Sequence, residues 1–418
     1  MSERNSVIIT FKPKDQRPDR QVDKLEIVRR ALAKGTCAHF FDAATLAKGV
    51  GRPSIEDQVI GYDVDRYEAP IVSVQLTQRE IQVLREDGNV AKVEDDVTCH
   101  ATGFGPYRHL KTRAEERPGT ETIPDGVKQV YAEGAWPISK GKGIGVAVLD
   151  TGIDFNHPDL KANYVGGVSF VPGTTPMDDN DPGHGTFCAG VIAAAKNGSG
   201  VVGVAPEASL YAVKVLDKKA SGLFSWSIAG IDWCMNQPEI HIINMSLGCE
   251  STPTALELMC NLAWSRGLLI VAGAGNQDGN PVPPQQSNVD YPARYRNVIA
   301  VSSIDSHNVI APNSARGCEV DLCAPGVDIQ STLPGGKCGP LSGTSVACPH
   351  VAGVAALAWA AHLSPKATNE QIWSLLASTA VDLGRTGRDS SYGYGCVNAK
   401  AAVSASFPSV VPKRGCCC

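Results

Sequence analysis

Three residues of this chain, Asp150, His184 and Ser345, are of the types that carry out nucleophilic catalysis, and each adjoins a glycine-rich turn. Asp150 ends the apolar run GVAVLD and enters the turn TGID, His184 lies in DPGHGTFCAG, and Ser345 lies in SGTSVACPHVAG. A serine hydroxyl is a weak nucleophile until a base takes its proton, and a histidine oriented by a carboxylate can be that base. The three residues therefore predict acyl transfer at Ser345, provided that folding brings their side chains together.

Each of the three residues also has a purely structural interpretation. Asp150 could cap a turn at the end of a strand, His184 could be a hydrogen-bonded structural histidine, and Ser345 could cap the helix that follows it. Together, each at its own Gly-rich turn and in the chain order Asp, His, Ser, they favour a catalytic triad.

The elements that would position these residues occupy residues 123 to about 404. Apolar strand-like runs recur along this region as GIGVAVLD, SLYAVKVLD, IHIINMSL, LLIVAGAG and NVIAVSSID, with the helix-like stretches GTFCAGVIAAA and SWSIAGIDWCMNQ between them. Apolar runs joined by helical crossovers predict an α/β fold with a doubly wound, mostly parallel sheet covered on both faces. Asp150 would then lie beyond the carboxyl end of a strand, where such sheets bind ligands.

Residues 1–103 are expected to form a separate small α+β domain. Strand-like segments at residues 7–12, 69–76 and 90–96 alternate with a helix-like segment at 22–34 and another that opens with a Thr77–Glu80 capping box. This βαββαβ order predicts a ferredoxin-like unit. Residues 104–122 lack periodicity and are expected to be an exposed processing linker, and residues 405–418 a tail.

Composition narrows the class of protein. The 418 residues carry a net charge of −5 and are 43% hydrophobic, and no basic stripe suggests nucleic acid as a partner. The N-terminus has only a short apolar run, and nothing approaches the ~20 apolar residues of a membrane span, so a cytoplasmic protein is expected. The 14 cysteines include no CxxC pair, which favours buried reduced thiols, such as Cys188 and Cys348, over a disulfide framework.

The motifs VLDTGIDFNHPDL, GHGTFCAG, GVAPEASLYAVKVL, INMSLG, GAGN, YPARY, LCAPGVDIQSTLPG and GTSVACPHVAGVAAL follow one another in this chain. In sequence and order they resemble those of the subtilisin family of serine endopeptidases, over residues 123 to about 403. The N-terminal zone, ending in NVAKVEDD, resembles that family's inhibitory prosegment. The resemblance implies a zymogen that cuts itself between about residues 99 and 122, where the linker holds Lys111, Arg113 and Arg117.

The resemblance also implies roles for individual residues. Ser345 would be the nucleophile, His184 its base and Asp150 the group that orients the imidazole, while Asn276 would donate to the oxyanion beside the Ser345 backbone N–H. Asn276 could equally be an ordinary turn residue after a strand. A polypeptide substrate would lie extended between residues 220–224 and 245–248. The implied substrate-binding residues are Gly222, Ser246, Leu247 and Gly248.

Asp290 departs from the family pattern. It immediately precedes the Tyr-Pro pair at which the floor of the family's specificity pocket lies, where many relatives have a small or neutral residue. A carboxylate there would favour Arg or Lys before the scissile bond. Alternatively, Asp290 points into solvent or pairs with Arg294 or Arg296.

A calcium site is also implied by the resemblance. Asp159 in HPDLK and the loop AAKNGSGV match the family's strong Ca²⁺ site, with Asn197 and the carbonyls of Ala195, Ser199 and Val201 as oxygen ligands. The alternative is a plain polar surface loop, and Lys196 places a positive charge within it. No residue of the N-terminal side matches the further ligand that the family usually adds.

Cysteines outside these motifs suggest two further features. The ending PKRGCCC could be lipidated at Cys416–Cys418 and associate with membranes, or be a tail without function. Oxidation of Cys249 could block substrate binding.

Two other functions are compatible with a fold of this kind. An inactive binding protein is disfavoured by the intact candidate residues, and a lipase is disfavoured by the missing GxSxG elbow and the different triad order. The expected partners of this monomer are polypeptide substrates and its own prosegment.

Overall fold

Seven parallel strands form the central sheet of the computed structural model, in the order β16-β15-β14-β12-β8-β10-β9. The structure describes residues 3–33, 36, 38–42, 59–66, 68, 70–102, 115–116, 119–277, 286–363 and 367–409. The bounds of the strands are β8 Gly145–Asp150, β9 Tyr164–Ser169, β10 Ser209–Lys214, β12 Ile240–Met245, β14 Leu269–Gly273, β15 Val298–Ile304 and β16 Val320–Pro325. The sequence predicted five of them and the α/β class; β9 and β16 were missed.

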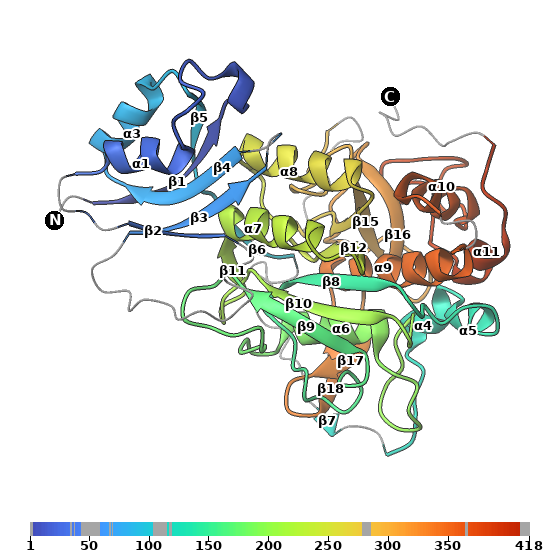
Figure 1. Ribbon diagram of the computed structural model, residues 1–418. Coiled ribbons are helices and arrows are strands. Elements are labelled where there is room, and N and C mark those ends of the chain that lie inside the picture. The colour runs from blue at the N-terminus through green and yellow to red at the C-terminus, as the bar shows by residue number, and fades with distance from the viewer. Residues whose placement is uncertain are drawn as a thin grey trace.

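Helices cover both faces of this sheet (Figure 1). Alternate residues of a strand point to opposite faces, so Val146 and Val148 pack into one apolar core, while Ala147 and Leu149 pack into the other. The helices of the first core are α4 Asp125–Gln129, α5 Ala132–Ala135, α6 His184–Ala193, α9 Thr344–Ala361, α10 Asn369–Thr379 and α11 Ala399–Ser404. The helices of the second are α7 Phe224–Met235 and α8 Thr254–Ser265.

Helix α9 is long and apolar enough to cross a membrane by length and composition, yet 89% of it is buried within the protein. It runs beneath the sheet against β12, β14, β15 and β16. Its apolar character is therefore that of a core helix.

The N-terminal domain has a ferredoxin-like core, as expected, with one additional strand. Its sheet order is β2-β3-β4-β1-β5, in which β2 lies at the edge, parallel to β3. The Thr77–Glu80 capping box predicted for the second helix is present. The element bounds are β1 Asn5–Phe11, η1 Lys14–Gln16, α1 Lys24–Ala31, β2 Ala38–Asp42, β3 Val59–Asp65, β4 Pro70–Leu76, α3 Gln78–Glu86 and β5 Val90–Asp95.

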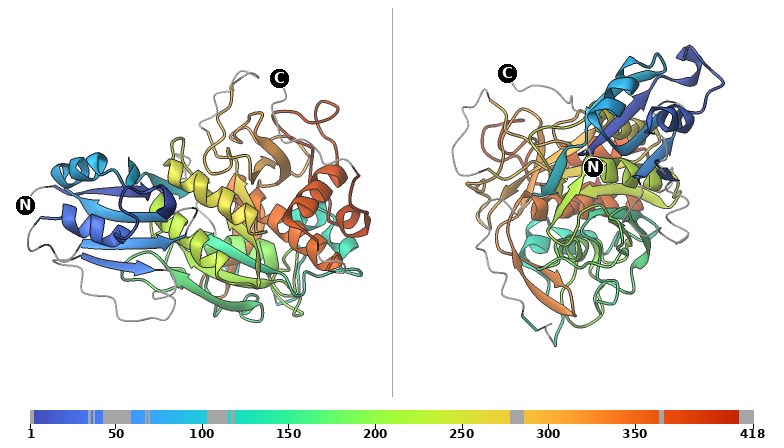
Figure 2. Two further views of the ribbon diagram at one scale, coloured as in Figure 1. Left: turned by 45° about the horizontal axis from the view of Figure 1, so that its top comes forward. Right: turned by 90° about the vertical axis from the view of Figure 1, so that its left-hand side faces the viewer.

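This domain lies at one end of the molecule, against α7 and α8 (Figures 1 and 2). Two of its carboxylates meet the N-termini of these helices. Glu94 accepts hydrogen bonds of 2.9 Å from the backbone N–H and the hydroxyl of Thr254, and Asp96 accepts one of 3.0 Å from the Ser225 N–H. Because helix N-termini carry unsatisfied N–H groups and a partial positive charge, they hold the domain in this orientation.

The described residues of the expected linker are mostly exposed, yet parts of it pair with the main domain. Strand β7, Glu115–Glu116, pairs with β18, Lys337–Leu341, which in turn pairs with β17, Ile329–Leu333. Two backbone hydrogen bonds also join Thr122 to the loop around Gly200. Backbone pairing with the main domain therefore orders segments that have no periodic sequence. Lys111, Arg113, Arg117 and the tail residues Cys416–Cys418 lie outside the described residues.

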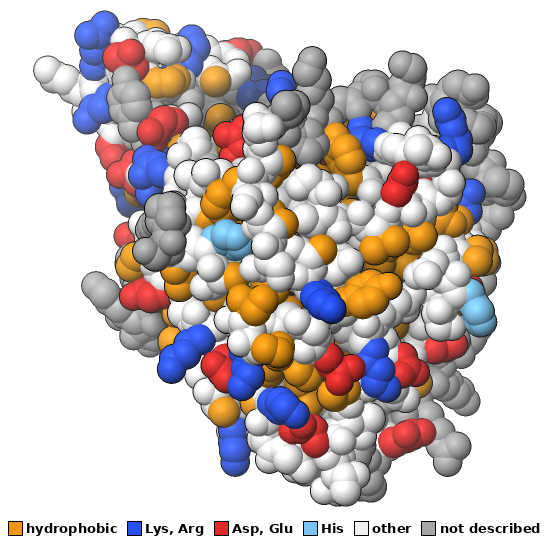
Figure 3. Space-filling view, turned by 90° about the vertical axis from the view of Figure 1, so that its right-hand side faces the viewer, with side chains coloured by type: hydrophobic (Ala, Val, Ile, Leu, Met, Phe, Trp, Pro, Cys, Tyr) orange, Lys and Arg blue, Asp and Glu red, His pale blue; other side chains and the backbone are white. Residues whose placement is uncertain are grey.

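The surface of the main domain carries mixed charge. On the face in Figure 3, lysine and arginine side chains lie beside acidic ones in the lower part, and hydrophobic side chains form patches across the middle. The start of the tail packs against this domain, because the His362 ring contacts both the Ala405 carbonyl and the Phe407 ring.

Candidate active site

The structure brings Asp150 and His184 into direct contact. Asp150 is the last residue of β8 and His184 the first of α6, and both are buried. The imidazole Nδ1 lies 2.8 Å from Asp150 Oδ1 and 3.0 Å from Oδ2. A carboxylate at Nδ1 fixes the tautomer that carries its proton on Nδ1, so that Nε2 is the nitrogen able to accept one.

Glycine makes this contact possible. A Cβ on Gly185 would lie 2.1 Å from the Gly152 carbonyl oxygen and 3.1 Å from Asp150 Cβ, so only glycine lets α6 begin this close to the strand end. The Asn180 side chain then accepts hydrogen bonds from the N–H groups of Gly183 and His184, at 3.2 and 3.1 Å. The turn DPGHG thus sets the position of the imidazole through its backbone.

Ser345 lies in the first turn of α9, directly beside the N-terminal half of α6. Its carbonyl oxygen accepts hydrogen bonds from Ser246 Oγ at 2.8 Å and from Cys188 Sγ at 3.5 Å. The Cys188 sulfur is itself within 4.8 Å of the ligand atoms of Asp150 and His184. The Ser345 hydroxyl is buried and makes no hydrogen bond with the described residues. The three predicted residues therefore lie near one another at one edge of the sheet, and the Ser345 hydroxyl has no hydrogen-bond partner among the described residues.

Asn276 lies beside the same helix N-terminus with its amide oriented. Its Oδ1 accepts a hydrogen bond of 3.0 Å from the Thr344 N–H, which fixes which end of the amide is oxygen because a backbone N–H can only donate. Its Nδ2 is buried and has no hydrogen-bond partner among the described residues. A buried donor without a partner is costly, and this amide is held at Thr344, the residue before Ser345.

A strand from the N-terminal domain lies between the two segments predicted to bind substrate, and the space between these segments is called the cleft below. Strand β6, Thr98–Ala101, lies antiparallel between β11, Ser221–Leu223, and β13, Leu247–Gly248. Thus the predicted binding residues Gly222, Leu247 and Gly248 all pair with one extended segment, and Ser246 accepts the next hydrogen bond, from the Thr102 N–H at 3.0 Å. The Ala101 N–H likewise donates to the Ala220 carbonyl at 3.0 Å.

Thr102 places a peptide carbonyl at Ser345. The Ser345 backbone N–H donates to the Thr102 carbonyl oxygen at 3.0 Å, which is the interaction expected of the oxyanion donor. The Thr102 side chain enters a pocket, since a Cβ on Gly248 would lie 3.2 Å from its Cγ2 and one on Gly273 2.7 Å from its Oγ1. Thr102 lies within the range of about residues 99 to 122 in which the sequence predicted self-cleavage, and the register of β6 singles it out as the residue beside Ser345.

Asp290 adjoins the same pocket. A Cβ on Gly248 would lie 3.0 Å from Asp290 Cβ, and one on Gly275 2.5 Å from its Oδ2. Burial, with a smaller contribution from the charge of Glu250, raises the pKa of Asp290 to about 7. The alternative pairing with Arg294 is not found, because that guanidinium pairs with Glu319 at 3.1 Å, and Asp290 has no salt bridge to a described residue.

Asp159 lies against the loop of residues 195–201 that holds the other predicted calcium ligands. Asp159 is fully buried, and its two oxygens accept hydrogen bonds from Asn197 Nδ2 at 3.0 Å and from the Val201 N–H at 3.1 Å. Lys196, the positive charge within this loop, forms a salt bridge of 2.6 Å with Glu121. Its ammonium group also lies over the Trp136 ring. Glu121, which the sequence reasoning missed, also accepts from the Gly198 N–H at 2.8 Å and brings a second carboxylate to the loop.

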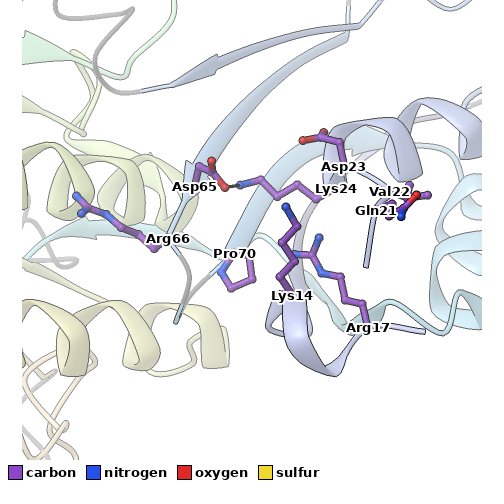
Figure 4. A pocket seen from close by; sticks show the side chains of 9 residues that line it. All are labelled: Lys14, Arg17, Gln21, Val22, Asp23, Lys24, Asp65, Arg66 and Pro70. Atoms are coloured by element: carbon purple, nitrogen blue, oxygen red, sulfur yellow. Dashed lines mark hydrogen bonds and ion pairs between the residues drawn. The ribbon is translucent and has the colours of Figure 1, made fainter. Parts of the chain in front are cut away.

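A cavity of about 430 Å³ lies elsewhere, within the N-terminal domain (Figure 4). Its buried cation, Lys24, is already paired with Asp63 at 2.7 Å and Asp65 at 2.8 Å, and it is remote from Ser345. The lining residues are Lys14, Arg17, Gln21, Val22, Asp23, Lys24, Asp65, Arg66 and Pro70. None of the predicted site residues lines this cavity.

Comparison with known proteins agrees with this geometry. Residues 141–395 match the Subtilase family. Subtilisin from Bacillus pumilus is 46% identical over 283 residues, which cover 68% of this chain and 99% of that protein. Subtilisin E from Bacillus subtilis (strain 168) is 43% identical over 328 residues, covering 78% and 79%, and M-protease from Shouchella clausii (strain KSM-K16) is 42% identical over 334 residues, covering 80% and 79%. The chain belongs to the subtilase family of subtilisin-like serine endopeptidases.

Proposed function

We propose that this serine endopeptidase cleaves extended polypeptides with Asp150, His184 and Ser345 as its triad. The observation that supports this most is the Thr102 carbonyl on the Ser345 N–H, because a peptide carbonyl there lies beside the uncommitted hydroxyl. Ser345 Oγ attacks the carbonyl carbon, and His184 takes the hydroxyl proton while Asp150 stabilises the imidazolium. His184 then protonates the leaving amine, and water releases the acyl group by the same steps in reverse.

The negative charge that develops on the carbonyl oxygen needs donors already in place. The Ser345 N–H is one, and Asn276 Nδ2, held by the Thr344 N–H and otherwise without a partner, is the second. Such preorganised donors stabilise the transition state without further rearrangement.

In this proposal, residues 1–102 are a prosegment. The active site of the same chain cuts it off at the Thr102–Gly103 bond. Strand β6 binds in the manner of a substrate, and Thr102 has the place of the residue before the scissile bond. The hydroxyl of Ser345 would form an ester with Thr102, and the amine of Gly103 would leave. The severed prosegment remains an inhibitor for as long as β6 stays in the cleft, and the basic linker residues are not needed for this cut.

Asp290 adds a preference for Arg or Lys before the scissile bond in other substrates. Its Cβ lies against Gly248, which also borders Thr102, its carboxylate lies against Gly275, and it has no salt bridge to a described residue. A bound guanidinium or ammonium would supply the missing charge. The prosegment's own Thr102 leaves that charge unpaired.

A structural Ca²⁺ ion fits the Asp159 loop. The carbonyl oxygens of Ala195 and Val201 accept no hydrogen bond from the described residues, and with Ser199 O and Asp159 they would supply oxygen ligands of the kind Ca²⁺ prefers. Asn197 would join them after its amide rotates, because its Nδ2 now donates to Asp159 and its Oδ1 accepts from the Ser199 N–H. When bound, the ion would neutralise the buried Asp159 carboxylate and stiffen the loop. It takes no part in peptide hydrolysis.

One set of variants tests this function. Purified wild-type protein should hydrolyse casein, react with a serine-directed phosphonate and yield a mature chain beginning at Gly103. Ser345→Ala should do none of these and should keep its first 102 residues. Ser342→Ala is the matched control, since this serine lies three residues earlier and its hydroxyl accepts from the Asp328 N–H at 2.9 Å. A pure Ser345→Ala protein that still loses its N-terminal domain would refute self-cleavage.

A further inference from the structure

Two cysteines lie opposite each other across the cleft, one on the prosegment and one on the main domain. In the pairing of β6 with β13, Ala101 is opposite Leu247 and His100 is opposite Gly248. The next pair in this register is Cys99 and Cys249. Both are free thiols.

The backbone directions specify which kind of pair this is. Along β6, the N–H of Thr102 points to β13 and that of Ala101 to the β11 side, so Cys99, two residues before Ala101, also directs its backbone groups to β11. The N–H and C=O of Cys249 are hydrogen-bonded to Tyr291, at 3.1 and 2.9 Å, on the far side. The two residues therefore form a non-hydrogen-bonded antiparallel pair, whose Cα atoms are ~4.5 Å apart. This lies within the ~4.4–6.8 Å range of disulfides.

The side chains share one face and one environment. Opposite residues of an antiparallel pair point to the same side of the sheet, and Cys99, Ala101, Leu247 and Cys249 all belong to the same apolar cluster. Cys99 is fully buried, whereas Cys249 is only half-buried. Burial raises the pKa of the Cys99 thiol, and a charge on Cys249 would raise it further, as expected of two sulfurs close together. An oxidant can thus reach Cys249 but not Cys99.

We propose that Cys99 and Cys249 form a disulfide that retains the cleaved prosegment in the substrate cleft. The inference rests on the proposed function, because it assigns a redox dependence to release of the inhibitor. The Cys249 thiolate attacks a small-molecule disulfide such as oxidised glutathione and releases one thiol. The Cys99 thiolate then attacks the Cys249 sulfur and releases the second. The two protein thiols lose two electrons and two protons, and the small disulfide gains them.

The effect would be to convert a dissociable inhibitor into a tethered one. After cleavage at Thr102, only noncovalent contacts hold β6, and dilution or proteolysis removes it. A covalent link gives the strand an effective concentration of ~mM at its own site. Because Cys99 is reactive only when the strand lifts from the cleft, the link should form slowly and should break on reduction.

A second thiol pair provides an internal control. Cys323 and Cys396 pair as a β-bridge within the main domain, and both lie in one small apolar cluster. A disulfide between them would not join the prosegment to anything. Cys396→Ser is therefore the matched variant for Cys99→Ser.

The test begins with the Ser345→Ala full chain, in which bond formation is independent of catalysis. After incubation with oxidised glutathione and alkylation of the remaining thiols, peptide mapping without reduction should recover a linked pair that contains Cys99 and Cys249. If both cysteines are instead recovered alkylated or glutathionylated under conditions that oxidise other cysteines of the chain, the proposal is wrong.

The active protein supplies the second readout. Oxidised wild-type protein and Cys396→Ser should keep the prosegment on a non-reducing gel, with activity below about a tenth of the reduced sample because of the tether, and dithiothreitol should restore it. Cys99→Ser should lose its prosegment equally under both conditions. Loss of the prosegment from oxidised wild type would overturn the proposal. A linked peptide in Ser345→Ala together with no self-cleavage in reduced wild type would instead refute the proposed function alone.

Discussion

Replacing Asp290 with asparagine changes the charge at the floor of the pocket and almost nothing in its shape. If the carboxylate contacts a bound Arg side chain, the variant loses a charge-assisted hydrogen bond of ~1.5–3 kcal/mol, which corresponds to a loss of ~10–150-fold in kcat/KM. Peptides with Leu before the scissile bond should be unaffected or improved. The quantity to measure is the Arg-to-Leu ratio of kcat/KM, because effects on the triad cancel in it.

The pH dependence gives the same prediction a second form. Because the pKa of Asp290 is raised to about 7, the carboxyl is mostly neutral at pH 6 and mostly ionised at pH 8. The Arg-to-Leu ratio of the wild type should therefore rise about tenfold between these two values, while that of Asp290→Asn stays level. A wild-type ratio that is flat with pH and equal to that of the variant would refute the placement of this carboxylate.

The same carboxyl should lower stability at alkaline pH. A pKa raised from 3.8 to about 7 means that folding disfavours the charged form, so this residue's contribution to stability falls as the pH rises from about 4 to 7. At ~1.4 kcal/mol for each pKa unit, the penalty at pH 8 is at most about 4 kcal/mol. Asp290→Asn, compared in the Ser345→Ala background to prevent self-digestion, should therefore have a higher Tm at pH 8 and an unchanged one at pH 3.

Other predictions concern the oxyanion site, the pocket and the metal. Asn276→Ala should lower kcat by ~10²–10³ with little change in KM; a raised KM alone would contradict its role. Gly248→Val should place methyl groups where Thr102 and Asp290 approach, so cleavage after Arg or Leu should fall by ~10²-fold while cleavage after Ala falls less. In the Ser345→Ala background, a chelator should lower the Tm, because a ligand at a hundred times its Kd adds ~2.7 kcal/mol to the free energy of unfolding. Asp159→Asn should abolish this difference in Tm. If the chelator changes the Tm of neither protein, the calcium ion is excluded.

Local sequence patterns predicted much of the fold because they report burial. The apolar runs around Val148, Ile243 and Val271 became neighbouring parallel strands of the central sheet. The Thr77 capping box formed as expected. The patterns failed where pairing partners are distant, as for β7, whose Glu115 and Glu116 have no apolar signal and depend on Lys337 and Cys338 for their hydrogen bonds.

The sequence by itself determined which residues could do the chemistry, since Asp150, His184, Ser345 and Asn276 each stand in a short motif that fixes local backbone geometry. Only the tertiary structure decided what those residues face. It placed the carbonyl of Thr102 on the Ser345 N–H, turned Asp290 toward Gly248, and set Cys99 opposite Cys249. The physical reason is that these contacts join segments that are distant in the sequence, and strand register and side-chain burial, which no local pattern encodes, determine them.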